Sequence, residues 1–69
     1  MEEVKIDGEY IELIRLLKFQ NWVESGGVAK MVVDDGMVLV NGEVELRRRK
    51  KLRVGDVVFF EGMEAKIVE

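Results

Sequence analysis

The sequence contains no cysteine and no histidine. Without cysteine the chain has neither a disulfide framework nor a thiolate metal site, and without histidine it lacks the commonest metal ligand and general base. Long hydrophobic runs are also missing, since no apolar stretch approaches the roughly 20 residues that span a bilayer. We therefore expect neither a metal site nor a membrane-spanning segment.

The first ten residues, MEEVKIDGEY, are acidic and lack the apolar core of a secretory signal. Hydrophobic residues still make up 48% of the 69 positions and charged residues 36%, a balance typical of a folded chain. The sequence shows no repeat, linker or low-complexity segment. These features predict a single small cytoplasmic domain, residues 1–69. The sequence does not determine its oligomeric state, and we expect a monomer.

Residue pairs suited to catalysis are poorly represented. Ser25 and Lys30 are five positions apart, which does not bring a nucleophile and a base side by side on a helix. No carboxylate falls inside an apolar stripe, where burial would tune its pKa. Gly26-Gly27 lacks the spacing of a phosphate-binding loop that ends in Lys-Ser or Lys-Thr. We therefore expect a protein that is not an enzyme and uses no cofactor.

Charge is spread unevenly along the chain. Residues 1–14 hold five acidic residues and one basic residue, residues 15–55 hold nine basic and five acidic, and residues 56–69 hold four acidic and one basic. The total is -3, yet Arg47–Lys51 form an unbroken basic run. Like charges repel, so folding alone gives no reason to keep this run together. We hypothesise that it meets negative charge on a partner.

Apolar spacing predicts two helices. Between residues 10 and 19 the apolar positions recur at steps of three and four. A second helix is expected to begin after Ser25, a preferred N-cap, and to end near Asp35, just before Gly36. Asp34 and Asp35 at its C-terminal end oppose the helix dipole, and the sequence offers no reason for them.

A period of two predicts strands in the rest of the chain. In residues 37–46, MVLVNGEVEL, apolar positions alternate on either side of Asn41-Gly42, the commonest two-residue hairpin turn. Shorter strands are expected over residues 4–6, 57–60 and 65–68. The predicted fold is α+β, with a short N-terminal strand and two helices packed on one face of a small antiparallel sheet.

The start of the second predicted helix is unusual. Gly26 and Gly27 occupy its first turn, where each costs about 1 kcal/mol relative to alanine. Because this turn has no acidic residue, its exposed N–H groups could bind a phosphate that the helix dipole favours, with Lys30 one turn further on. The alternative is that Ser25 is an ordinary cap and that the glycines allow close packing.

The basic run taken alone is typical of a solvated loop. Lys18, Lys30 and Arg53 add basic residues from other elements, however, and all of these could converge on one surface. Arginines would add bidentate phosphate contacts. Tyr10 and Trp22 could stack on an unpaired base. We expect both to pack in the core or at its margin, because nothing in the sequence places them beside the basic residues.

These segments together resemble the S-four, or alpha-L, RNA-binding domain, named after small-subunit ribosomal protein four, and especially its stand-alone bacterial members. The resemblance extends over nearly the whole chain, and the combination of motifs is specific. The matching segments are Ile11-Glu12-Leu13, Leu16-Leu17-Lys18, SGGVAK at 25–30, DGMVLVNGEVE at 35–45, RRRKKL at 47–52 and GD at 55–56.

The resemblance implies an alpha-L fold that recognises structured RNA, ribosomal or transfer RNA, largely through the RNA backbone, alone or on ribosome-assembly particles. The residues it implies as contacts are Lys18, Ser25, Gly26, Gly27, Lys30, Asn41, Arg47, Arg48, Arg49, Lys50, Lys51 and Arg53. The wider family often begins its first helix with Arg-Leu-Asp, whose arginine helps to contact RNA, whereas this chain has Glu12-Leu13-Ile14. We therefore expect the RNA contacts to come mainly from the start of the second helix and from the basic run.

A different function remains open from the sequence. The chain could be a protein-interaction module whose basic face docks an acidic partner, such as a replication or ribosome-assembly protein.

Overall fold

The computed structural model describes residues 1–69 and contains two helices and seven strands. The elements are, in order, β1 (Glu2–Lys5), β2 (Ile11–Glu12), α1 (Leu13–Phe19), α2 (Gly26–Asp34), β3 (Val38–Val40), β4 (Glu43–Val44), β5 (Lys51–Leu52), β6 (Val57–Phe60) and β7 (Met63–Val68).

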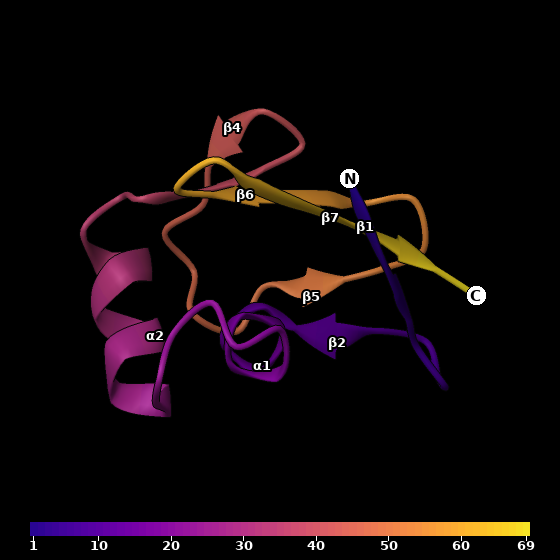
Figure 1. Cartoon of the computed structure of the whole chain (residues 1–69), viewed down its shortest axis with the longest axis horizontal. Coiled ribbons are helices and arrows are strands. Elements are labelled where there is room, and N and C mark those ends of the chain that lie inside the picture. The colour runs from indigo at the N-terminus through magenta and orange to yellow at the C-terminus, as the bar shows by residue number, and fades with distance from the viewer.

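The elements form two layers. Five strands make one sheet in the order β1-β7-β6-β3-β4, and β2 and β5 pair separately as a short antiparallel ribbon. In Figure 1 the five-stranded sheet lies across the top, with α1, α2 and the ribbon beneath one of its faces. This arrangement confirms the predicted α+β class and the placement of both helices on one side of a sheet.

The core lies between these layers and is entirely apolar. All fifteen buried residues are hydrophobic, and none is polar or charged. Alternate residues of the central strands face the helices, among them Val38, Val58 and Ala65. From the helices, Leu16 and Val33 are fully buried against them. Because burial of one such aliphatic side chain contributes roughly 1.5–3 kcal/mol, this layer holds the fold together without a metal or disulfide.

The hairpin forms at the predicted position. Leu39 pairs with Val44 and Val40 with Glu43, and the two turn residues between them, Asn41 and Gly42, have φ angles of 53° and 84°. Positive φ at both central positions is the signature of a type I′ turn, which matches the twist of the flanking strands.

The sheet is mixed, where the sequence predicted an antiparallel one. β1 pairs in parallel with β7, so that Val4 lies beside Ile67 and both are buried. A period of two identifies a strand but carries no information on the direction of its neighbour. Parallel pairing needs a long connection between the two strands, and here almost the whole chain supplies it.

The first helix is shorter than predicted. It begins at Leu13 rather than near Tyr10, because Ile11 and Glu12 pair with β5 as a strand. The second helix begins directly after Ser25 and ends at Asp34, as the capping residues indicated.

Candidate nucleic-acid interface

The basic run is bound through its backbone to the start of α1. Two N–H groups in the first turn of α1 donate to carbonyls of the run: Leu13 to Lys50 at 2.9 Å and Ile14 to Arg48 at 3.2 Å. The residue before the helix, Glu12, provides no side-chain cap. Carbonyls of the basic run therefore satisfy helix donors that would otherwise lack partners, and this anchors the run to the fold.

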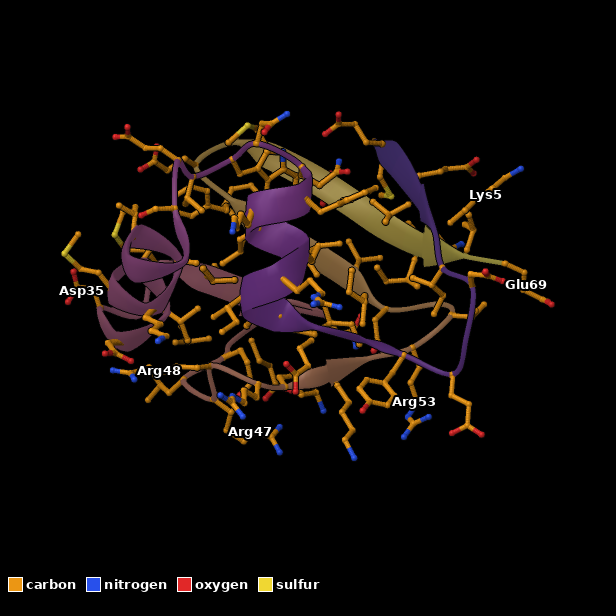
Figure 2. All side chains as sticks on the ribbon, turned by 90° about the horizontal axis from the view of Figure 1, so that it is seen from below. Lys5, Asp35, Arg47, Arg48, Arg53 and Glu69 are labelled. Atoms are coloured by element: carbon orange, nitrogen blue, oxygen red, sulfur yellow. The ribbon has the colours of Figure 1, made fainter.

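The side chains of the run extend outward from this anchored backbone. In Figure 2 Arg47, Arg48 and Arg53 lie along the lower edge of the molecule, whereas Lys5 lies at the upper right. All three arginines are exposed. The structure thus presents one basic edge formed by the run and by Arg53.

Two of the arginines are paired within the protein. Arg47 donates from Nε and Nη2 to the two carboxylate oxygens of Glu45, at 2.9 and 3.1 Å. Arg48 donates in the same bidentate way to Asp34, at 2.9 and 2.6 Å. These hydrogen bonds lower the pKa of both carboxyl groups and raise the pKa of both guanidinium groups. Each pair orients its arginine while partly neutralising it.

Asp34 now has a physical role that sequence reasoning missed. A carboxylate in the last turn of a helix opposes the dipole. In the structure Asp34 receives Arg48 from a loop that is 14 residues away in sequence. Nothing local in the sequence signals this pairing.

The remaining cations of the edge belong to neither of the two ion pairs. Lys50 is half-buried, and its charge helps to lower the pKa of Glu45. Arg49, Lys51 and Arg53 are exposed and have no carboxylate partner. The backbone N–H of Arg53 donates to Asp56 Oδ2 at 2.8 Å, which fixes the chain at that point. These three side chains are therefore the ones most available to an external anion.

Asn41 contributes to this framework from the hairpin turn. Its Nδ2 donates to Asp56 Oδ1 at 3.0 Å, and its Oδ1 accepts from the backbone N–H of Val57 at 2.9 Å. Both polar ends of the side chain are thus engaged within the protein. Asn41 and Asp56 together join the hairpin turn to the segment that carries Arg53.

The second predicted contact region lies at the start of α2. Ser25 Oγ accepts from the Val28 N–H at 3.2 Å, as expected of an N-cap, and the first turn has no acidic residue. A Cβ atom added at Gly26 would meet nothing within 4 Å, and one at Gly27 would meet only Ser25 Oγ at 3.7 Å. Close packing therefore does not explain the glycines.

The basic run and the start of α2 lie at opposite ends of the pair formed by α1 and α2. Arg48 binds Asp34 at the last residue of α2, whereas Ser25 caps its first. From Gly26 to Asp34 the helix rises by eight steps of 1.5 Å, or about 12 Å. Lys18 lies in the last turn of α1, away from the basic run that caps the start of that helix. Arg53 therefore lies on the same edge as the basic run, whereas Lys18 lies at the opposite end of α1.

The two aromatic residues singled out in the sequence differ in their surroundings. Trp22 is half-buried and stacks on Phe60 with ring centroids 6.5 Å apart, which confirms its predicted packing role. The prediction for Tyr10 was wrong. Tyr10 is 42% exposed, with Lys51 Nζ 5.0 Å and Arg53 Cζ 5.8 Å from the centroid of its ring. Pairing of β2 with β5 brings Tyr10 next to Lys51 and Arg53. The sequence does not indicate this contact, because the residues are far apart along the chain.

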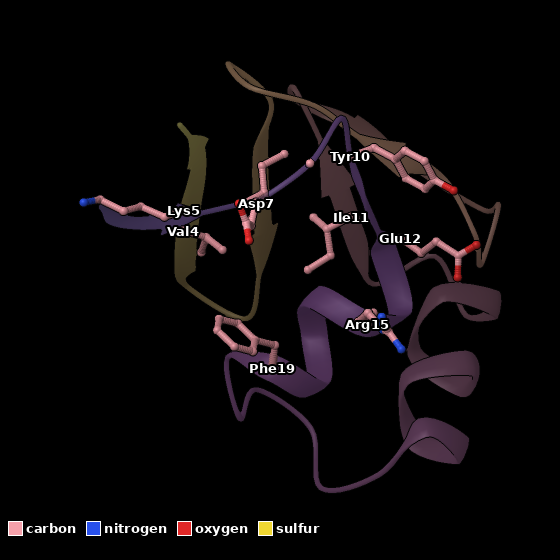
Figure 3. Close-up of a pocket in the computed structure, with 10 residues that line it drawn as sticks. Val4, Lys5, Asp7, Tyr10, Ile11, Glu12, Arg15 and Phe19 are labelled. Atoms are coloured by element: carbon pink, nitrogen blue, oxygen red, sulfur yellow. The ribbon is translucent and has the colours of Figure 1, made fainter.

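A groove lies beside this edge. It has a volume of about 530 Å3 and runs between residues 4–8 and α1, as Figure 3 shows. Its charged lining residues are Lys5, Asp7, Glu12 and Arg15, and no serine or threonine lines it. Groups of three or more carboxylates that could hold a metal ion are absent. No helix is both long and apolar enough to span a bilayer.

Comparison with known proteins identifies similar chains. Residues 4–68 match the family model for the S4 domain. YbcJ of Escherichia coli K12 is 42% identical over 86% of this chain and 84% of its own length. The probable ribosome maturation protein RlbA of Bacillus subtilis 168 is 48% identical over 86% of this chain and 83% of its own length.

A solved structure has the same architecture. The solution structure of Escherichia coli YbcJ, described as revealing an alpha-L motif involved in RNA binding, superposes with a TM-score of 0.75. The match is 37% identical and covers 100% of this chain and 89% of that one. This similarity confirms the alpha-L fold expected from the sequence.

Proposed function

Because the chain belongs to the S4-domain family, we propose that it binds structured RNA and catalyses no reaction. The observation that carries the proposal is the basic edge, where Arg49, Lys51 and Arg53 are exposed and free of carboxylate partners. The description of YbcJ as carrying an RNA-binding motif supports the same function.

The edge suits a phosphate backbone because it is already ordered. The carbonyls of Arg48 and Lys50 are bound to α1, so the run does not have to fold when RNA arrives. Arg47 and Arg48 are held in place by their carboxylates and can share donors with a nearby phosphate. Binding to the edge should therefore be electrostatic and sensitive to salt.

The start of α2 supplies a second phosphate contact in this proposal. A Cβ atom at Gly26 would meet nothing within 4 Å, so a ligand can approach the backbone there, and Lys30 in α2 and Lys18 in the last turn of α1 add positive charge to the helices. An RNA whose phosphates match the distance of about 12 Å between this end and Arg48 would engage both regions. A regular B-form duplex would satisfy only some of these contacts, so shape would decide affinity.

The proposed target is a ribosomal or transfer RNA, reached in the cytoplasm as a monomer or on ribosome-assembly particles. The name of the Bacillus subtilis relative, a probable ribosome maturation protein, supports the ribosomal choice. The acidic ends of the chain would discourage indiscriminate binding to polyanions.

The proposal is tested by charge reversal at the edge. In Arg49→Glu/Lys51→Glu the affinity for a structured ribosomal RNA fragment should fall at least about tenfold, because two phosphate contacts become repulsive. The matched control is Lys5→Glu/Lys66→Glu, which makes the same charge change on exposed residues of β1 and β7. It should bind nearly as the wild type does. Affinity is measured by fluorescence anisotropy, and folding by the thermal midpoint.

An amide NMR titration then locates the contacts. Shifts at residues 25–30 and 47–53 should be larger with the RNA fragment than with a DNA duplex of equal charge. Equal losses of affinity in both double variants would contradict a localised interface. A protein complex that survives nuclease treatment of a lysate, combined with no RNA binding, would favour the acidic-partner alternative instead.

A further inference from the structure

The ribbon formed by β2 and β5 has an inner and an outer face. Ile11 lies opposite Leu52, and both pack into the core. Because side chains alternate along a strand, the flanking residues Tyr10, Lys51 and Arg53 lie on the outer face. Figure 3 shows that Tyr10 and Ile11 extend to opposite sides of β2. An aromatic ring and two cationic side chains therefore lie side by side on the outer face of the ribbon.

The ring and its cations form a site suited to a nucleotide. Lys51 and Arg53 lie over the ring of Tyr10, and Tyr10 as a whole residue is 42% exposed. Neither cation belongs to an ion pair, whereas Arg47 and Arg48 do. An exposed aromatic ring stacks on a base regardless of its identity, and an adjacent cation binds the phosphate of the same nucleotide.

We propose that Tyr10 stacks on an unpaired base of the bound RNA, while Lys51 and Arg53 bind the phosphates on either side of that nucleotide. This inference rests on the proposed RNA-binding function and adds the feature that is recognised: an unpaired nucleotide within or beside an RNA helix. Bases within a continuous helix are stacked on each other and cannot reach the ring.

The cations over the ring are easily exchanged for a base. A cation–π contact at an exposed site is weak, and the base offers the ring a larger stacking surface. As the base arrives, Lys51 and Arg53 move from the ring to its phosphates. Glu12, opposite Lys51 on the same face, repels phosphate but accepts hydrogen bonds from the amino groups of a base.

Stability of the ribbon does not require the ring. Leu52 is fully buried and Ile11 packs against the core, and α1 is tied to the neighbouring run by two backbone hydrogen bonds. Tyr10 lies outside this arrangement. Its removal should therefore change RNA recognition far more than folding.

The test uses two RNA hairpins, one fully paired and one with a single bulged 2-aminopurine nucleotide. Affinity is measured at low salt for the wild type and for Tyr10→Leu and Tyr10→Phe. The matched control is Phe19→Leu, which removes the ring of a residue that is 65% exposed. Phe19 is the last residue of α1, at the end of that helix farther from the ribbon. All variants are first checked for an unchanged thermal midpoint.

The wild type should prefer the bulged hairpin about tenfold and should quench the 2-aminopurine fluorescence. Tyr10→Leu should bind both hairpins equally and cause no quenching, whereas Tyr10→Phe and Phe19→Leu should behave as the wild type. If Tyr10→Leu instead lowers the affinity for both hairpins by the same factor and keeps the preference for the bulge, the ring only positions Lys51 and Arg53. That result would overturn the inference.

Failure of this inference is distinguishable from failure of the proposed function. A wild type that binds the paired hairpin without preference for the bulge overturns only the role of Tyr10. A wild type that binds neither hairpin overturns both.

Discussion

Arg48 reaches from the basic run to the last turn of α2, where two of its guanidinium nitrogens bind Asp34. Arg47 makes the equivalent pair with its near neighbour Glu45. At the scale of single residues, the five cations of the run are therefore not equivalent. Two are oriented by carboxylates, Lys50 is half-buried, and Arg49 and Lys51 are exposed and belong to no ion pair.

The Asp34 pair makes a prediction about pH. Because the hydrogen bonds from Arg48 lower the pKa of Asp34 in the folded protein, the pair stabilises the fold above the ordinary carboxyl value. That contribution is lost as the pH falls through the lowered pKa. In Arg48→Met the pKa of Asp34 should rise to its ordinary range, measured by the ¹³C shift of its carboxyl carbon during titration. Glu45, whose partner is Arg47, is the internal control and should be unchanged.

The opposite result of this titration would contradict the interpretation of the Asp34–Arg48 pair. If Asp34 titrates identically in the wild type and in Arg48→Met, the pair does not persist in solution and Arg48 is as free as Arg49.

At the scale of elements, the start of α2 combines a good cap with poor helix formers. Ser25 satisfies the Val28 N–H, while Gly26 and Gly27 leave the backbone uncovered. Glycine there costs stability that alanine would restore, and no neighbouring atom requires its small size. We propose that the glycines allow a ligand to approach the backbone closely.

This explanation predicts opposite effects on stability and on binding. Gly26→Ala should raise the free energy of unfolding by about 0.5–1 kcal/mol, because alanine favours the helix. It should also weaken RNA binding, because the new Cβ obstructs a phosphate at the helix N-terminus. Urea unfolding and fluorescence anisotropy measure the two effects. Gly8→Ala, where a Cβ also meets nothing within 4 Å, is the control and should leave RNA affinity unchanged.

A Gly26→Ala variant that is more stable and binds RNA normally would remove the start of α2 from the interface. The basic edge would then carry the binding alone.

At the scale of the whole molecule, a chain with net charge -3 presents one basic edge. The acidic residues are concentrated in the terminal segments, residues 1–14 and 56–69. Most of their side chains belong to β1, β7 and the adjoining turns rather than to the ribbon. This separation lets the edge attract phosphate while the rest of the surface repels it.

The separation predicts a strong dependence of binding on salt. About four phosphate contacts would give a slope of log K against log salt of roughly -3 to -4, so raising salt from 50 to 200 mM should weaken RNA binding roughly 100-fold. The core is apolar, so the thermal midpoint should change little over the same range. Anisotropy titrations at several salt concentrations give the slope. A slope near zero would mean that phosphate contacts do not drive binding.

Local patterns in the sequence determined the elements and the chemistry of the edge. The apolar period of α2, the Ser25 cap and the type I′ turn at Asn41-Gly42 depend on neighbouring residues only, so they were predicted at their observed positions. The basic run is likewise visible in sequence. The motif resemblance extended these local signals to the alpha-L fold, which the similar structure confirms.

Only the tertiary structure decided which of these residues meet. The parallel pairing of β1 with β7, the contact of Arg48 with Asp34 and the placement of Lys51 and Arg53 over Tyr10 all join segments distant in sequence. Such contacts depend on strand direction and register, which side-chain periodicity does not encode. The sequence determined that positive charge would be concentrated in one segment, and the packing of that segment against α1 and β2 determined what lies beside it.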